Sequence, residues 1–292
     1  MNDAAIARAR IIRRELELGS WTYATRAPDH RLAPLMHRDL CGFALSGARF
    51  SSWLEPPRPA LTLMIDLDGA ISVDHEQLPD SWFGGLSSTY AVVGFDGGAY
   101  GSIDLEFNPL GAYRILGMPL SELAGIVVSL EDLFGAHGRA LAEQVRALAG
   151  WDRRFDLVER FLLERLVRGP QPTPAVEWAW WRLRSSGGNF RVEQLAAEIG
   201  CSRRYLLDRF RAEVGLPPKT AGRLVRFERV CKRLRAAPAR WAQIAADAGY
   251  CDQPHLNRDF RELAGTTPSE FLARCIPGGG VVGDGMAVSA GV

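Results

Sequence analysis

One sequence pattern occurs twice in the last third of the chain. Leu206-x3-Phe210-x4-Gly215-x2-Pro218 returns at an offset of 50 as Leu256-x3-Phe260-x4-Gly265-x2-Pro268. Upstream of it, Ala196-x3-Gly200 returns at an offset of 49 as Ala245-x3-Gly249. Two apolar helices joined by a short glycine-containing turn form a helix-turn-helix unit. The repeat therefore predicts two such units, one after the other.

Charge is divided unevenly along the chain. Residues 1–174 contain 17 Arg and no Lys against 22 Asp and Glu, whereas residues 175–276 contain 18 Lys and Arg against 11 Asp and Glu. A basic half joined to an acidic half predicts a polyanionic partner for the second half alone.

The length of 292 residues and the hydrophobic content of 47% allow two domains. We expect a β-rich sensory or dimerisation domain at 1–168 and an all-α DNA-binding domain at 175–276. The run at 169–174, Gly-Pro-Gln-Pro-Thr-Pro, cannot continue a helix and predicts a stiff, extended linker. Residues 277–292 are rich in glycine and are expected to be disordered.

Cysteine usage and hydropathy bear on the compartment. The five cysteines are odd in number and none forms a CxxC motif, so we expect neither a disulfide framework nor a zinc site. Residues 1–14 lack the apolar run of a signal peptide, and the sequence contains no stretch of about 18 apolar residues. These observations predict a cytoplasmic protein without a membrane partner.

Alternation of apolar and polar residues predicts strands in the N-terminal half. Residues 61–67 and 71–73 alternate around Asp68-Gly69, which is a strong hairpin signal. A second hairpin is predicted from 89–95 and 100–107, with Ile103, Leu105 and Phe107 on its apolar face. Short antiparallel strands with one apolar face predict a small barrel or sandwich. Helical spacing then predicts helices over 112–116, 121–126, 138–148 and 151–167.

Aromatic residues near the predicted strands allow two interpretations. They either line a pocket for an apolar or aromatic small molecule in the mouth of a barrel, or they fill its core. The candidate pocket residues are Trp53, Trp82, Phe83, Tyr90 and Tyr100.

No pattern in the N-terminal half supports catalysis. His30, His37, His75 and His137 are isolated from one another, and the sequence offers no Ser/His/Asp arrangement, carboxylate pair or phosphate loop. We therefore expect no metal, no cofactor and no enzymatic activity.

Each predicted unit presents a polar face on its second helix. With caps at Ser202 and Asp252, a rotation of about 100° per residue turns the repeated Leu and Phe inward. The outward faces are predicted to contact DNA through Ser202, Arg203, Arg204, Leu207, Asp208, Arg211, Gln253, His255, Asn257, Arg258 and Arg261. Arg and Asn discriminate guanine and adenine by paired hydrogen bonds. His255, at the edge of its face, either touches DNA or packs against the turn.

Between the units, Leu224, Phe227, Val230 and Leu234 have helical spacing and predict a linking helix over 220–236. Such a helix would hold the two readers at a fixed separation. Residues 175–185 predict the first helix of the domain. Thr267 and Glu270 frame a capping box that predicts its last helix.

The second unit also has a specific resemblance. Its residues are Ile244, Ala245, Ala248, Gly249 and Tyr250, followed by Gln253-x2-Leu256-x-Arg258-x-Phe260-Arg261-x3-Gly265-x-Thr267-Pro268. This series resembles the signature of AraC-type (AraC/XylS) transcriptional regulators, and the resemblance covers both units. It implies a seven-helix DNA-binding domain whose two recognition helices enter successive major grooves. It also implies an N-terminal domain, often a cupin-like barrel, that senses an effector or dimerises.

A second, shorter resemblance lies in the N-terminal half. Phe107-Asn108-Pro109-x-Gly111 and Leu116-Gly117-Met118-Pro119-x-Ser121-Glu122-Leu123 are similar to an N-terminal sensory domain of actinobacterial members. Three residues depart from the AraC-type pattern: Leu256 stands where many members have Phe, and Leu207 and Asp208 are unusual at reading positions. They bear on base preference rather than on the fold.

Together these features predict an α+β regulator that binds double-stranded DNA under the control of a small-molecule effector, with RNA polymerase as a further partner if it activates. One alternative is a regulator whose N-terminal domain only forms a homodimer. Another is an enzyme, or a DNA-repair alkyl acceptor, fused to a DNA-binding domain. An alkyl acceptor needs an activated thiolate, and Cys41 is the only cysteine of the N-terminal half. Cys251, beside the second cap, is either redox-sensitive or a buried structural thiol.

Overall fold

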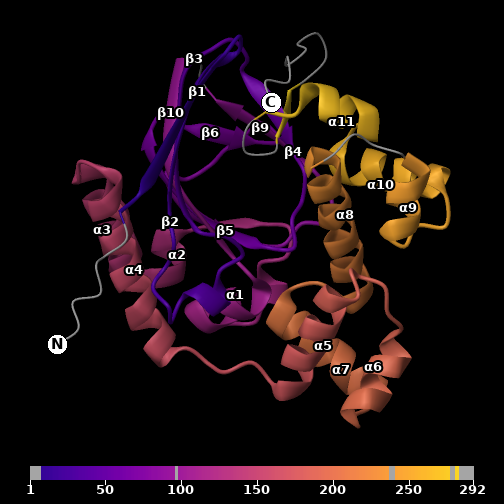
Figure 1. Ribbon diagram of the computed structural model, residues 1–292. Coiled ribbons are helices and arrows are strands. Elements are labelled where there is room, and N and C mark those ends of the chain that lie inside the picture. The colour runs from indigo at the N-terminus through magenta and orange to yellow at the C-terminus, as the bar shows by residue number, and fades with distance from the viewer. Residues whose placement is uncertain (1–7, 96–97, 237–240, 277–279, 283–292) are drawn as a thin grey trace.

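The computed structural model describes residues 8–95, 98–236, 241–276 and 280–282. It is an α+β structure in which two antiparallel sheets enclose a common interior and α-helices form the rest (Figure 1). The larger sheet has the order β1-β2-β3-β10-β5-β8-β11, with strands Arg10–Leu16, Gly19–Arg26, Leu40–Ala48, Gly98–Phe107, Leu61–Asp68, Ser81–Gly84 and Val127–Ser129. The smaller sheet has the order β12-β4-β9-β6-β7, with strands Val281–Val282, Ser52–Glu55, Ala91–Phe95, Ile71–Val73 and Glu76–Gln77.

The two hairpins predicted from alternation are wrong, although the strands themselves form. Both edges of β5 are occupied by β10 and β8, so β6 pairs with β9 in the other sheet. In the same way β9 pairs with β4 and β6, while β10 pairs with β3 and β5. Residues 96 and 97 of the second predicted turn lie outside the described residues. The chain therefore crosses between sheets at both points.

Gly69 permits the first of these crossings. Its φ is +78°, and a Cβ there would lie 2.9 Å from the backbone oxygen of Ala99. A side chain at this position would be strained by both the backbone angle and the close approach. The Asp68-Gly69 pair thus marks a change of sheet rather than a hairpin.

Helices cover the outer face of the larger sheet. They are α1 (Pro109–Leu116), α2 (Leu130–Phe134), α3 (Ala136–Ala147) and α4 (Trp151–Arg168). The helix predicted over 121–126 is wrong, because only a 3-10 turn, η2 (Leu120–Glu122), forms there. Ile103, Leu105 and Phe107 are fully buried under these helices, as expected of an apolar face. Ser102 and Glu106 on the opposite face are also buried, because that face lines the interior rather than solvent.

In the second half, the regular secondary structure of the described residues up to 274 is helical. Its helices are α5 (Pro174–Ser185), α6 (Val192–Ile199), α7 (Arg203–Val214), α8 (Pro218–Ala236), α9 (Trp241–Asp247), α10 (Gln253–Ala264) and α11 (Pro268–Arg274). Ser202 and Asp252 cap α7 and α10, and Thr267 with Glu270 forms the predicted capping box of α11. The predicted linking helix is α8, which stands between the two helix-turn-helix units (Figure 1).

The hydrophobic cores do not follow the predicted division into halves. Leu206, Phe210 and Val214 of α7 belong to the same buried cluster as Leu120 and the helices of the N-terminal half. The second unit and part of α8 form a separate cluster. Thr173, in the linker, donates to Glu213 of α7 through its backbone nitrogen at 2.8 Å. The first unit is thus packed directly against the N-terminal half.

The sequence predicts a disordered tail over residues 277–292. Part of this tail is in fact structured. Residues 280–282 are described, and Val281 and Val282 are buried in β12, which pairs with Leu54 and Trp53 of β4. Residues 277–279 and 283–292 lie outside the described residues. Burial of the apolar side chains of Val281 and Val282 stabilises the pairing of β12 with the edge of the smaller sheet. Among the described helices, none is long and apolar enough to cross a membrane.

Candidate DNA-reading surface and barrel cavity

The first reading helix, α7, presents a polar face. Ser202 Oγ accepts the backbone N–H of Tyr205 at 3.1 Å. The side chains of Arg204 and Asp208 are 93% and 73% exposed, and their charged atoms lie 3.8 Å apart. Arg203 is bonded to Glu193 at 2.9 Å. Leu207 is half-buried and Arg211 is exposed. On this face Arg204 is therefore opposed by an acidic neighbour.

The second reading helix, α10, has a basic face whose arginines are not paired with acidic side chains of the described residues. Gln253, Arg258 and Arg261 are exposed, Asn257 is half-buried, and neither arginine forms an ion pair within the described part of the chain. His255 packs edge-on against Tyr250, with ring centroids 5.0 Å apart. Of the two roles open to His255 from the sequence, this geometry favours packing on the turn. Cys251 is exposed rather than buried.

Arginines of α8 brace the second unit. Arg223 bonds Glu262 and, at 2.9 Å, Asp259, both on α10. Arg233 bonds Asp247 of α9 at 3.3 Å. With 19 residues and a rise of 1.5 Å per residue, α8 is about 28 Å long. It can therefore hold α7 and α10 at a fixed separation.

A cavity of about 160 Å³ lies between the two sheets. Its walls are mostly apolar and aromatic and include Trp53, Trp82 and Tyr100 of the predicted pocket. Phe83 and Tyr90 are not among its lining residues. Phe83 stacks on Phe107 beneath the outer helices because its strand position points outward. Tyr90 lies against Gly265. A Cβ added at Gly265 would be 3.0 Å from Cζ of Tyr90.

Ile276 and Gly280 complete the cavity wall. Both follow α11 of the second half in sequence. A Cβ on Gly280 would lie 2.3 Å from Cδ1 of Trp53, so only glycine allows the chain to pass so close to the ring. The cavity is thus formed by the barrel together with the segment that leaves the last helix.

Strand register aligns the inward side chains of the larger sheet in rows. Asp104 of β10 lies opposite Cys41 of β3 and Met64 of β5, and Met64 lies opposite Trp82 of β8. In the next row, Ser102 lies opposite Phe43, which lies opposite Tyr23 of β2. The polar Asp104 row and the aromatic rows therefore share one cavity.

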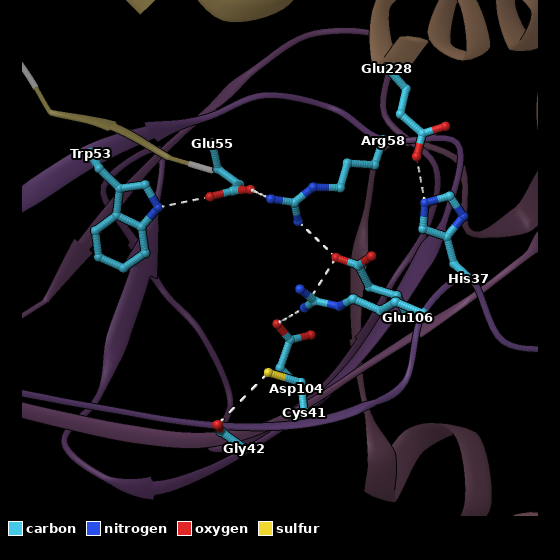
Figure 2. A network of polar contacts seen from close by, with 10 residues as sticks. His37, Cys41, Gly42, Trp53, Glu55, Arg58, Asp104, Glu106 and Glu228 are labelled. Carbon is cyan, nitrogen blue, oxygen red and sulfur yellow. Dashed lines mark hydrogen bonds and ion pairs between the residues drawn. The ribbon is translucent and has the colours of Figure 1, made fainter. Parts of the chain in front are cut away.

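Two arginines and three carboxylates form a charged cluster at this cavity, made of Arg38, Glu55, Arg58, Asp104 and Glu106. Figure 2 labels all of them except Arg38. Arg38 bonds Asp104 and lies 3.2 Å from Glu106. Arg58 bonds Glu55 at 2.6 Å and Glu106 at 2.8 Å. Burial raises the pKa of Asp104 and of Glu55. Burial opposes ionisation of Glu106 as well, but Arg58 and Arg38 hold its pKa below the usual value.

On its other side, the charged cluster borders a cleft of about 200 Å³ between the barrel and the second half. There His37 Nε2 lies 2.7 Å from Oε1 of Glu228 on α8 (Figure 2). Arg184 of α5 and Lys232 of α8 also bond Glu228. Burial by itself raises the pKa of Glu228. The hydrogen bonds from His37 and Lys232 outweigh this effect and hold the pKa well below its usual range. The backbone N–H of His37 donates to the carbonyl oxygen of Glu106 at 2.8 Å, and this bond links the charged cluster to the contact with α8.

Residues 195–274 match a family model described as a helix-turn-helix domain. The second half contains an AraC-type helix-turn-helix domain. The chain is accordingly a DNA-binding transcription regulator. No curated protein matches it.

Solved structures similar to the chain include two of ToxT and one of a domain of AraT. ToxT from Vibrio cholerae O395 is 11% identical, with a TM-score of 0.47, over 79% of this chain and 95% of that one. A structure of ToxT from Vibrio cholerae with unsaturated fatty acid bound is 11% identical, with a TM-score of 0.47, over 89% and 96%. The C-terminal domain of AraT, a response regulator from Geobacillus stearothermophilus, is 22% identical, with a TM-score of 0.32, over 34% and 84%. At these TM-scores the likenesses say nothing of what this chain binds.

Several residues around the cavity were not foreseen from the sequence. The alternation in β10 placed Asp104 and Glu106 opposite the apolar face, but alternation does not distinguish a solvent face from a cavity face. His37 and Glu228 are 191 residues apart, and only the packing of the two halves brings them together. Ile276 comes directly before the segment predicted to be disordered, and Gly280 lies within it.

Proposed function

We propose that this AraC-type regulator is controlled by a small molecule bound in the barrel cavity. The observation that carries the proposal is the presence of Ile276 and Gly280 in the cavity wall. Ile276 lies two residues and Gly280 six residues beyond the end of α11, so a ligand in the cavity contacts chain that leaves the DNA-binding domain. A ligand that fits one position of this segment better than another shifts the population of domain arrangements.

Two further contacts support coupling between cavity and DNA. The charged cluster connects through Arg58, Glu106 and His37 to Glu228 of α8, the helix that spaces the two readers. In addition, α7 shares its core with the N-terminal half. A change in the barrel therefore has a physical route to each reading helix.

We propose that Arg204, Asn257 and Arg258 contact base edges, because they lie on the outward faces of the first two turns of α7 and α10. The remaining predicted DNA contacts, at the helix starts and along the same faces, are Ser202, Arg203, Leu207, Asp208, Arg211, Gln253 and Arg261, whereas His255 packs on Tyr250 of the turn. Exposed positive charges and helix N-termini suit phosphate oxygens. A homodimer, and RNA polymerase as a partner of an activator, remain part of the proposal.

The rival proposals have less support. A barrel that only dimerises has no need of a cavity that is completed by the DNA-binding half. An alkyl acceptor needs a thiol with a lowered pKa, whereas burial raises the pKa of Cys41 to about 12. We therefore propose binding rather than turnover at this site.

The test uses the full chain, with an operator selected from random-sequence duplexes. Compounds that raise the melting temperature are identified first, because a ligand of the folded state stabilises it. Operator affinity is then measured with and without each compound. Val73→Trp places a large ring in the cavity from a half-buried position, and Val167→Trp, at a site 87% exposed, is its control.

Effector control predicts that the selected compounds change operator affinity in the wild type and in Val167→Trp but not in Val73→Trp. An operator affinity that no stabilising compound changes, and that Val73→Trp leaves at the wild-type value, would favour the dimerisation alternative.

A further inference from the structure

The cavity contains polar atoms for which the described part of the chain supplies no partner. Nε1 of Trp21, Nε1 of Trp82, the hydroxyl of Tyr23 and Oδ1 of Asp104 are buried without a hydrogen bond. All four residues line the cavity, and Trp21 is fully buried. A buried polar group without a partner costs about 1–3 kcal/mol. These atoms are therefore suited to a ligand that supplies their partners.

The balance of charge indicates what such a ligand carries. Arg38 and Arg58 are the cations among the described lining residues, and each is already bonded to two carboxylates. When all members are ionised, the charged cluster has two positive and three negative charges. The nearby His37 is bonded to Glu228. The ionised cluster thus carries one more negative than positive charge, and among the described lining residues an anionic ligand would meet only one unbonded N–H of a cation, at Nε of Arg38.

The walls and the volume fit the same kind of molecule. Trp21, Tyr23, Phe43, Trp53 and Tyr100 present aromatic rings around the cavity. An ammonium group near such a ring gains about 0.5–2 kcal/mol. An apolar cavity of about 150 Å³ takes up benzene, so the roughly 160 Å³ here suits a ligand with a single ring.

We propose that the cavity binds a single-ring arylalkylamine with an oxygen substituent, whose protonated amino group donates to Oδ1 of Asp104 and whose oxygen accepts from Trp21 or Trp82. This inference rests on the proposed effector control and specifies its ligand. Burial raises the pKa of Asp104, and a bound ammonium group would favour its ionised form again. Aromatic carboxylates of the same size are disfavoured by the surplus of negative charge.

Three probes that differ mainly in charge test the proposal on the full chain. Tyramine carries an ammonium group, tyrosol a neutral hydroxyl in its place, and para-hydroxyphenylacetate a carboxylate. Calorimetric binding constants should rank tyramine first, about tenfold tighter than tyrosol, as expected for one charged hydrogen bond. The carboxylate should bind most weakly. The reverse ranking, or no binding by tyramine, would overturn the proposal.

Asp104→Asn tests the assigned partner. This variant should bind tyrosol as the wild type does, while tyramine loses its tenfold advantage. Asp68→Asn, on the exposed end of neighbouring β5, removes an equal charge outside the cavity and should leave the ranking unchanged. Because Asp104 also bonds Arg38, the melting temperature of each variant is measured first, and the wild-type ranking decides the matter if Asp104→Asn does not fold. An unchanged tyramine advantage in folded Asp104→Asn would also overturn the proposal.

The outcomes separate this inference from the proposed function. If tyramine ranks first but leaves operator affinity unchanged, the ligand class stands and effector control fails. If para-hydroxyphenylacetate ranks first and changes operator affinity, effector control stands and the amine is overturned.

Discussion

His37 Nε2 lies 2.7 Å from Oε1 of Glu228, and this contact joins the barrel to the helix that separates the two reading units. Glu228 also bonds Arg184 and Lys232 at 2.8 and 2.7 Å. One carboxylate therefore holds together three segments: the loop before β3, α5 and α8. Its side chain is 11% exposed, so solvent screens these pairs only weakly.

Glu228→Gln should lower the free energy of unfolding at pH 7 by about 2 kcal/mol, since the amide keeps the shape but loses the charged bonds. The pKa of Glu228 is held below its unfolded value near 4.5. The stabilisation is therefore present above that value and is lost as the pH falls below it. Urea unfolding at pH 7 and at pH 4 measures both effects. Glu131→Gln, at a pair about half exposed, is the control and should cost far less.

Arg204→Ala and Arg258→Ala should each weaken operator binding by about 1–3 kcal/mol and relax the preference at one base pair. Both side chains project from reading faces. Arg160→Ala, at an exposed position of α4, should leave binding unchanged. Fluorescence anisotropy with single-base-pair variants of the operator gives the measurement. Equal affinities for all three variants would contradict the assigned surface.

Asp208→Asn should tighten operator binding. Its carboxylate lies 3.8 Å from Arg204 and faces the same side of α7, so it competes with phosphate and base edges for that arginine. Removing one negative charge at the surface should also reduce the repulsion of DNA, by about 0.5–1 kcal/mol at low salt. A double-mutant cycle with Arg204→Ala checks whether the gain passes through Arg204. An equal gain in the Arg204→Ala background would show that it does not.

Asp66→Asn should stabilise the protein above pH 6. Burial raises the pKa of Asp66 to about 6, against an ordinary value of 3.8. Between these values the folded chain holds the proton more tightly, so the wild type loses stability as the pH rises. Two pKa units correspond to about 2–3 kcal/mol, and Asn keeps an oxygen to accept from the Tyr100 hydroxyl. Thermal unfolding between pH 4 and pH 8 should show a flatter profile for Asp66→Asn than for the wild type or Asp68→Asn.

Much of the second half follows from local sequence. Ser202, Asp252 and Thr267 cap their helices as predicted, because capping depends on a few neighbouring residues. Leu206, Phe210, Leu256 and Phe260 are fully buried as the repeat predicts. The outward reading faces follow from the same periodicity. These features needed no knowledge of distant contacts.

Only the tertiary structure decided how the parts meet. Alternation revealed the strands β5, β6, β9 and β10, but pairing depends on which edges other strands already occupy, and local pattern does not contain that information. For the same reason the cavity could not be predicted, because Asp104 and Glu106 alternate with apolar residues in the way that solvent-exposed residues do. His37 and Glu228, Leu120 and α7, and Trp53 and Gly280 meet only when the halves pack. The sequence by itself determined the two repeated helices and their polar outward faces, because both follow from local periodicity, whereas the long-range packing of the barrel decided where the cavity lies and how it connects to those helices.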